Sequence, residues 1–116
     1  MQHRDKTAIL KMIDEMGIGL ELLGDTPLEA FLAGEMLKRA LGMTAINVGE
    51  LVKLVSDDLR TAYPDFPWRA VAGMRDITAH RYQTLRMEDV FVTVHDEYPV
   101  LLEKLKGILA AEADNE

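Results

Sequence analysis

The chain has 116 residues and a mass of 13.0 kDa, which is enough for one hydrophobic core. Cysteine is absent, so disulfides, thiolate metal clusters and a cysteine nucleophile are excluded. Twenty acidic residues against thirteen basic ones give a formal charge of -7, which argues against a surface that binds nucleic acid throughout. Any anion site must therefore be local. No apolar run suits a signal peptide or a membrane span, so we expect a cytoplasmic protein without membrane attachment.

The first predicted helix extends from Asp5 to Leu23. Its apolar residues recur every three or four positions and form one stripe: Ile9, Ile13, Met16, Leu20 and Leu23. The segment Gly24-Asp25-Thr26-Pro27 then ends this helix and begins another, because glycine suits a helix end and aspartate or threonine caps a helix with proline in its first turn.

The second predicted helix is long, from about Pro27 to about Arg60, because no proline interrupts it. One apolar stripe contains Leu37, Leu41, Val48, Leu51, Val55 and Leu59. A second stripe contains Leu32, Met36, Met43 and Leu54, and Asn47 and Glu50 lie along it. Two apolar faces fit either the central helix of a monomer or a helix shared with a second copy, and both remain open. Burial of the two polar residues would require polar partners.

The segment Tyr63-Pro64-Asp65-Phe66-Pro67-Trp68 is a clear break, since two prolines three residues apart do not fit inside a helix. A third helix is predicted from Pro67 to near His80. A last helix is predicted from about Met87 to Ala113, with a kink at Pro99 and a frayed tail over residues 112–116. The chain is thus expected to be one all-α domain over residues 1–116, an up-and-down bundle of four main helices.

Positive charge is concentrated in one segment of this acidic chain. Residues 60–86 contain five arginines, two aspartates and no lysine, a local charge of +3, while the rest of the chain carries -10. The planar guanidinium group holds phosphate oxygens in pairs. The alternative is that these arginines pair with carboxylates where helices meet.

His80 is the best candidate for a chemical role. His3 and His95 have no evident set of partners, and no spacing of a metal or cofactor site occurs, so neither is predicted. An imidazole transfers protons near neutral pH, and the guanidinium of Arg75 can stabilise the extra charge of a phosphorane transition state. Such a pair suffices to cleave RNA through the ribose 2′-hydroxyl, although a purely structural role for both residues fits as well.

The spacing of Arg75 and His80 poses a geometric problem. Residues five apart on a regular helix are rotated by about 140° and do not share a face. Either the helix ends before His80, or two copies of the motif meet across a dimer. Both solutions make the site depend on assembly.

The segment from Pro67 to Tyr82, read Pro-Trp-Arg-Ala-Val-Ala-Gly-Met-Arg-Asp-Ile-Thr-Ala-His-Arg-Tyr, resembles the signature of HepT-like toxins of the HEPN superfamily, which is R-x-x-x-x-H-x-Y. Val48-Gly49-Glu50 resembles the Gly-Glu of that family's long second helix. The likeness extends over nearly the whole chain. One departure is Asp76, where the family often has asparagine; this acid either orients Arg75 or weakens phosphate binding.

The resemblance implies a dimeric helical bundle in which Arg75 and His80 of both subunits form a cleft for metal-independent RNA cleavage. Asp76 and Glu50 would have supporting roles. It also implies a minimal nucleotidyltransferase antitoxin that adenylylates Tyr82. Phosphate two residues from His80 would place the charge of the substrate in the cleft, although a packed ring at the dimer seam is an equally good account of Tyr82.

Arg81 and Trp68 are further candidates for RNA contact, with Trp68 also a candidate core anchor for its turn. The leading hypothesis is a homodimeric ribonuclease toxin. A second hypothesis is a non-catalytic helical module on which residues 75–82 dock a nucleotidyltransferase. A third is a dimeric domain without an enzymatic partner.

Overall fold

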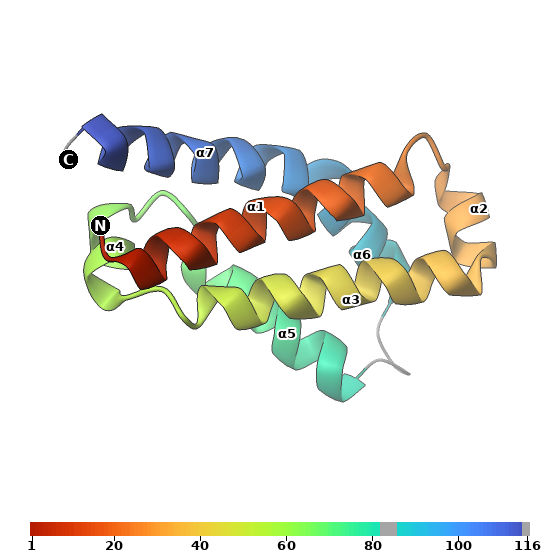
Figure 1. The fold of residues 1–116 in the computed structure, drawn as a ribbon. Helices are drawn as coiled ribbons and strands as arrows, with labels where there is room; N and C mark the ends of the chain where they lie inside the picture. Colours follow the sequence, from red (N-terminus) through yellow and green to blue (C-terminus); the bar gives the residue numbers. More distant parts are fainter. Residues whose placement is uncertain (82–85, 115–116) are drawn as a thin grey trace.

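Four long helices, running alternately up and down the molecule, form the bundle (Figure 1). The computed structural model describes residues 1–81 and 86–114, and it describes side chains for residues 1–74 and 86–114. The long helices are α1 (His3–Leu23), α3 (Glu35–Val52), α5 (Trp68–Arg81) and α7 (Tyr98–Asp114). Short elements connect them: α2 (Leu28–Ala33), α4 (Asp57–Ala62), α6 (Met87–Val92) and the π-helical segment η1 (Thr93–Glu97).

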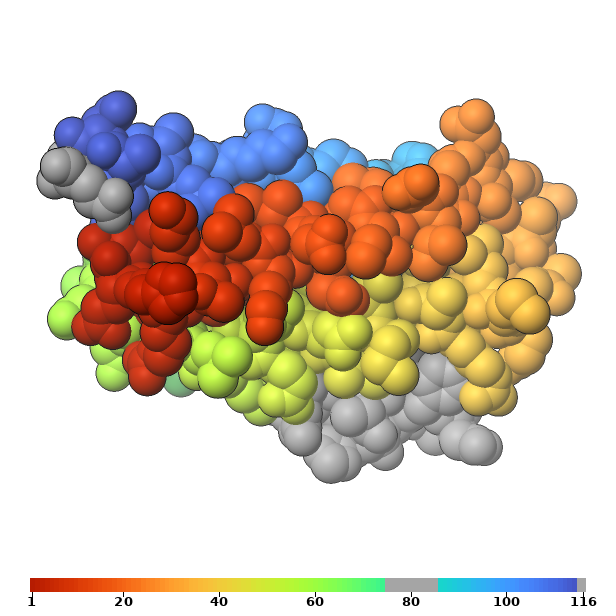
Figure 2. Space-filling view, in the orientation of Figure 1, coloured from red at the N-terminus to blue at the C-terminus, as the bar shows by residue number. Residues whose placement is uncertain are grey.

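The prediction of an all-α, up-and-down bundle is confirmed, and no strand occurs in the two described ranges. Helix α1 lies between α7 and α3 on one face, as the space-filling view shows (Figure 2), and α5 packs on α3. Residues from all the main helices join one apolar core, in which Ile9, Leu41, Val71 and Leu105 are almost completely buried. None of the helices, as far as they are described, is long and apolar enough to span a bilayer.

Helix α1 ends where the sequence predicts. Gly24 has φ +51°, a backbone conformation that residues with a Cβ rarely adopt, and its N–H donates to the carbonyl of Leu20 at 2.9 Å. The stripe predicted for this helix faces the core, with Ile9 and Met16 fully buried.

The prediction of one long helix from Pro27 to Arg60 is wrong. The chain forms three helices there, because Gly34 is extended between α2 and α3 and a turn over residues 53–56 separates α3 from α4. The first break lets α2 cross the end of the bundle, where Phe31 is fully buried and its ring lies 5.6 Å from that of Phe91. Burial of this aromatic ring outweighs the continuation of a helix.

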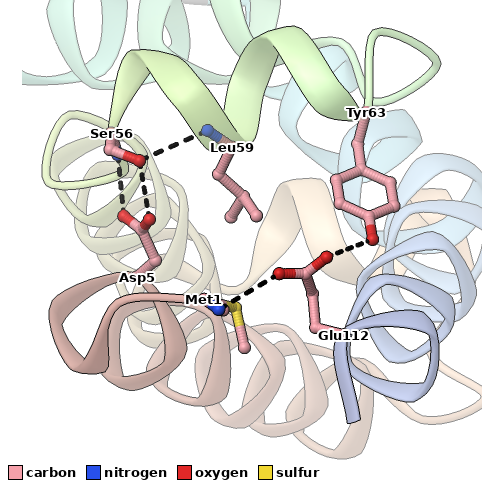
Figure 3. A network of polar contacts seen from close by, with 6 residues as sticks. All are labelled: Met1, Asp5, Ser56, Leu59, Tyr63 and Glu112. Carbon is pink, nitrogen blue, oxygen red and sulfur yellow. Dashed lines mark hydrogen bonds and ion pairs between the residues drawn. The ribbon is translucent and has the colours of Figure 1, made fainter. Parts of the chain in front are cut away.

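The second break is held by a residue far away in the sequence. Asp5 of α1 is 2% exposed, and its carboxylate accepts hydrogen bonds from the backbone N–H of Ser56 at 2.7 Å and from its hydroxyl at 2.6 Å (Figure 3). The Ser56 hydroxyl oxygen in turn accepts from the N–H of Leu59, which caps α4. The buried carboxylate thus fixes the start of α4 against the first turn of α1.

The break before α5 and the long C-terminal helical region are confirmed. Helix α5 begins at Trp68, one residue after the predicted start at Pro67. In the C-terminal region, the turn before Pro99 is π-helical, and the N–H of Tyr98 donates to the carbonyl of Thr93. Helix α6 therefore meets α7 at an angle (Figure 1), close to the predicted kink.

Residues 112–114, which we expected to fray, are the last residues of α7, while residues 115 and 116 lie outside the described part. The Glu112 carboxylate accepts a hydrogen bond from the hydroxyl of Tyr63 at 2.6 Å and pairs with the amino group of Met1 at 3.4 Å (Figure 3). The hydrogen bond from Tyr63 holds the pKa of Glu112 below its usual range. This ion pair ties the end of α7 to α1.

A buried polar contact joins α3 to α7. The hydroxyl groups of Thr44 and Tyr98 are 2.9 Å apart, and burial raises the pKa of Tyr98 to about 12, so its phenol stays protonated at neutral pH. Gly19 of α1 lies against this pair. A Cβ at Gly19 would come within 2.9 Å of the Tyr98 ring and 3.3 Å of the Thr44 hydroxyl. The three helices meet closely at this point because position 19 carries no side chain.

Substitution of two glycines in α1 should have opposite effects on stability. Gly19→Ala should lower the free energy of unfolding by roughly 1–3 kcal/mol, because the Tyr98 ring is locked by its hydrogen bond and cannot move away. Gly17→Ala meets no atom within 4 Å and should raise stability by about 0.5–1 kcal/mol through helix propensity. Urea unfolding measures both, and a stabilised Gly19→Ala variant would contradict the close approach.

Candidate active site on helix α5

The motif positions lie on the C-terminal half of α5. The backbone of this helix is described through Arg81, so positions 75, 76 and 80 are helical. The side chains of Arg75, Asp76, His80 and Arg81 lie outside the described set, and Tyr82 lies outside the described residues altogether. The structure therefore gives the helix register of the motif and not the contacts of its side chains.

Helix α5 does not end before His80, so the first of the two solutions to the spacing problem is wrong. In a continuous α-helix, positions 75 and 80 are rotated by about 140° and separated by about 7.5 Å along the axis. The other solution, that groups from two copies of the motif meet, stays a prediction.

The register of α5 relates position 75 to the packed face of the helix. Trp68 and Val71 are buried, and position 75 continues their series at i, i+3 and i+7. Helix α5 packs on α3, which carries Glu50 near its C-terminal end. Glu50 is exposed, and buried Gly49 precedes it. The predicted supporting residue thus belongs to the helix on which the motif helix rests.

Trp68 is a core anchor. Its side chain is 7% exposed, its Nε1 donates a hydrogen bond to the carbonyl of Tyr63 at 2.9 Å, and its ring centroid lies 4.3 Å from that of Phe66. A nucleobase needs an open ring face for stacking. Of the two roles considered for Trp68, we therefore retain the anchor and withdraw RNA contact.

Two of the five clustered arginines have structural partners. Arg60 donates from Nη2 to the carbonyl of Val52 at 2.7 Å and from Nε to that of Val55 at 3.2 Å, so it caps the C-terminal end of α3. Arg86 lies 3.6 Å from the carboxylate of Glu88. Arg69 is exposed on the first turn of α5. The structural alternative for the clustered arginines therefore holds in part, with backbone carbonyls as the partners of Arg60 and a carboxylate as the partner of Arg86.

The other histidines have local partners. His95 Nδ1 lies 2.6 Å from an Asp96 oxygen, and its ring stacks on Phe91 with centroids 5.2 Å apart. His3 lies 3.4 Å from the hydroxyl of Thr7. Within the described ranges, no three side chains of His, Asp or Glu converge as ligands for a metal ion.

Comparison with known proteins places this helix arrangement in a family. The model described as "Ribonuclease HepT-like" matches residues 11–108, a range that begins within α1, ends within α7 and contains the entire motif. The chain belongs to the HepT-like ribonuclease family. This membership confirms the resemblance found in the sequence and supports the prediction of ribonuclease activity.

Relatives of this HepT-like chain have similar lengths. A protein of Caldanaerobacter subterraneus subsp. tengcongensis that carries an RNase name is 29% identical over 87% of this chain and 90% of its own length. A Methanocaldococcus jannaschii protein, also with an RNase name, is 29% identical over 94% of this chain and 95% of its own length. A Thermococcus cleftensis protein that carries the name ribonuclease HepT is 30% identical over 69% of this chain and 73% of its own length. No solved structure gives a significant match.

The second apolar stripe of this HepT-like chain is solvent-exposed except at Leu32, which is partly buried against the core. Met36 is 86% exposed, Met43 54% and Leu54 51%, whereas Leu41 and Val48 of the first stripe are fully buried. Of the polar residues on the second stripe, Asn47 donates to a Glu15 carboxylate oxygen at 2.9 Å. Met36 and Met43 of α3 and Leu54 of the following turn thus form an exposed apolar strip, and α3 itself packs on α5, the helix that carries the motif.

Proposed function

We propose that this chain is the toxin of a bacterial or archaeal toxin–antitoxin pair and acts in the cytoplasm as a metal-independent endoribonuclease. The family match over residues 11–108, which includes the complete motif from Arg75 to Tyr82, carries this proposal. His80 acts as the acid–base group, Arg75 binds the scissile phosphate, and Asp76 and Glu50 orient the arginine. Arg81 adds a phosphate contact.

The chemistry needs only these side chains and RNA. The His80 imidazole accepts the proton of a ribose 2′-hydroxyl, and the 2′-oxygen attacks the adjacent phosphorus. The bond from phosphorus to the 5′-oxygen breaks, and that oxygen leaves with a proton from an imidazolium. The guanidinium of Arg75 offsets the added negative charge of the transition state. The products are a 2′,3′-cyclic phosphate and a 5′-hydroxyl, and DNA is not a substrate because it lacks the attacking group.

Chelation tests this mechanism. Cleavage of a defined RNA should proceed at the same rate in EDTA, and mass spectrometry of the products should show a 2′,3′-cyclic phosphate end. The matched DNA oligonucleotide should remain intact. Loss of cleavage on chelation, restored by added divalent metal, would contradict the mechanism.

A homodimer completes the site in this proposal. Helix α5 is continuous through positions 75 and 80, which favours a cleft that combines motifs from two copies. The exposed strip of Met36, Met43 and Leu54 on and beside α3 supplies an apolar surface next to the motif helix. Burial of this strip against a second copy is favourable and would bring the two α5 helices together.

Met43→Asp should disrupt the dimer and RNA cleavage together. An unpaired carboxylate buried at the interface should raise the dimer dissociation constant by at least about tenfold. Light scattering coupled to gel filtration measures the mass. Leu10→Asp on α1, which also replaces an exposed apolar residue, is the matched control and should leave the dimer intact. A Met43→Asp variant that remains dimeric would exclude this strip as the interface.

We also infer that a minimal nucleotidyltransferase antitoxin inactivates the toxin by adenylylating Tyr82. The adduct would bring a phosphate two residues from His80, where the proposed cleft receives the RNA phosphate. A nucleotidyltransferase encoded by the neighbouring reading frame would support this partner.

A further inference from the structure

A groove lies between the start of α5 and the junction of η1 with α7, and its lining residues among the described side chains precede the motif or belong to the C-terminal region. It encloses about 420 Å³. Buried Val71 and Leu101 lie at its base, and Ala70, Met74 and the 56% exposed Val100 line its sides. These residues form a continuous apolar concavity.

The centre of the groove is offset around α5 from the motif positions 75 and 80. Its lining residues on this helix, Ala70, Val71 and Met74, recur at helical spacing. Positions 75 and 80 are rotated by roughly 90° and 130° from the centre of that series, at 100° per residue. A ligand in the groove would therefore lie beside position 75, which neighbours Val71 around the helix, and farther from position 80.

The rim of the groove is acidic. Asp65, Asp96 and Glu97 contribute carboxylates, and Lys104 contributes one ammonium group, which lies 3.4 Å from the backbone carbonyl of Asp65. His95 Nδ1 lies 2.6 Å from an oxygen of Asp96, and this contact fixes the carboxylate at the rim. The excess of carboxylates repels phosphodiesters and attracts cations.

We propose that this groove docks a segment of a partner protein that presents an aliphatic side chain flanked by arginine or lysine. The aliphatic group fits the apolar base over Val71 and Leu101, and the cations pair with the carboxylates of the rim. The α3 strip, on a different helix, is the surface proposed above for a second copy of this chain. The inference does not depend on the proposed ribonuclease activity.

Matched peptides test the groove. The probe is a short fluorescein-labelled peptide with leucines one helical turn apart and flanking arginines. One control peptide has glutamates in place of the arginines, and another has glycines in place of the leucines. Fluorescence anisotropy with the full chain should detect binding of the first peptide only, and methyl resonances of Val71 and Leu101 should shift. Absence of binding by the arginine–leucine peptide would overturn the proposal, as would equal binding of the glycine control.

Two variants locate the binding. Ala70→Trp fills the groove without changing its charge, and Val100→Asp places a charge on its apolar side; each should weaken peptide binding at least about tenfold. Val92→Asp, an exposed valine outside the lining, is the matched control and should bind as the wild type does. Unchanged affinity in both groove variants would overturn the proposal. Dissociation of a homodimer by Val100→Asp, or displacement of the peptide from the groove by RNA, would assign it to a different occupant and overturn it too.

Discussion

Replacing His80 with alanine should lower the rate of RNA cleavage by about 100- to 10,000-fold, the usual contribution of a general acid–base group. Arg75→Ala should cost about 100- to 1,000-fold, because one donor to the transition-state charge is lost. Single-turnover cleavage of a labelled RNA measures both rates. His95→Ala is the matched control, since this exposed histidine lies outside the motif and should leave cleavage unchanged. Circular dichroism should show the same helix content in all variants.

Mixing the two inactive variants tests whether the site is shared between subunits. If Arg75 of one subunit acts with His80 of the other, a heterodimer of Arg75→Ala and His80→Ala subunits has one intact site. Random exchange between subunits should then restore about a quarter of wild-type activity. Mixed dimers without recovered activity would show that both groups come from one subunit. Equal background cleavage by the wild type and both variants would instead favour the non-catalytic docking module.

Asp5→Ala should lower the free energy of unfolding by about 2–4 kcal/mol. This is the largest effect on stability that we expect from the loss of a single polar side chain in this protein. The carboxylate is 2% exposed and accepts two short hydrogen bonds from Ser56. Its removal leaves the N–H and hydroxyl of Ser56 without this acceptor in a partly buried position and loosens the start of α4 (Figure 3). Thermal unfolding should show a midpoint lower by roughly 10 °C.

Asp14→Ala supplies the control for this effect. Asp14 lies on the same helix but is exposed, so its replacement should change stability by less than about 0.5 kcal/mol. The free energy of unfolding of the Asp5→Asn variant should lie between those of the two alanine variants. Its amide oxygen still accepts one hydrogen bond, whereas its NH₂ group faces a donor. Equal stability of the Asp5→Ala and Asp14→Ala variants would show that the contact to Ser56 does not hold α4.

Local proline and glycine signals in the sequence predicted some of the helix ends, while Gly34, which lies between α2 and α3, was not recognised as one. Gly24 ends α1, and the two prolines around Phe66 separate α4 from α5. The ends of α3 were missed because tertiary contacts determine them. Phe31 packs across the end of the bundle before α3, and Asp5 holds Ser56 from 51 positions away. No local pattern reports such contacts.

The sequence predicted the motif of the candidate site but not the groove beside it. The order of residues from Arg75 to Tyr82 pointed to the family, and the family match confirms that inference. The apolar groove was not predicted, because its two sides come from segments about 30 residues apart, around Val71 and Leu101. The only sequence signal was that Asp96, Glu97 and Val100 are spaced to share one helical face. Nothing in the sequence indicated that this face would meet α5.

The wide turn of η1 makes one place in the C-terminal region tolerant of a change in chain length. A π-helical turn accommodates one residue more than an α-helical turn, so removal of a residue such as exposed His95 would allow the segment to close as a regular helix. Pro99 would keep its place early in α7, and the core side chains that follow, such as Leu105, would retain their register. Insertions and deletions among relatives should therefore accumulate here and be absent from the middle of α3.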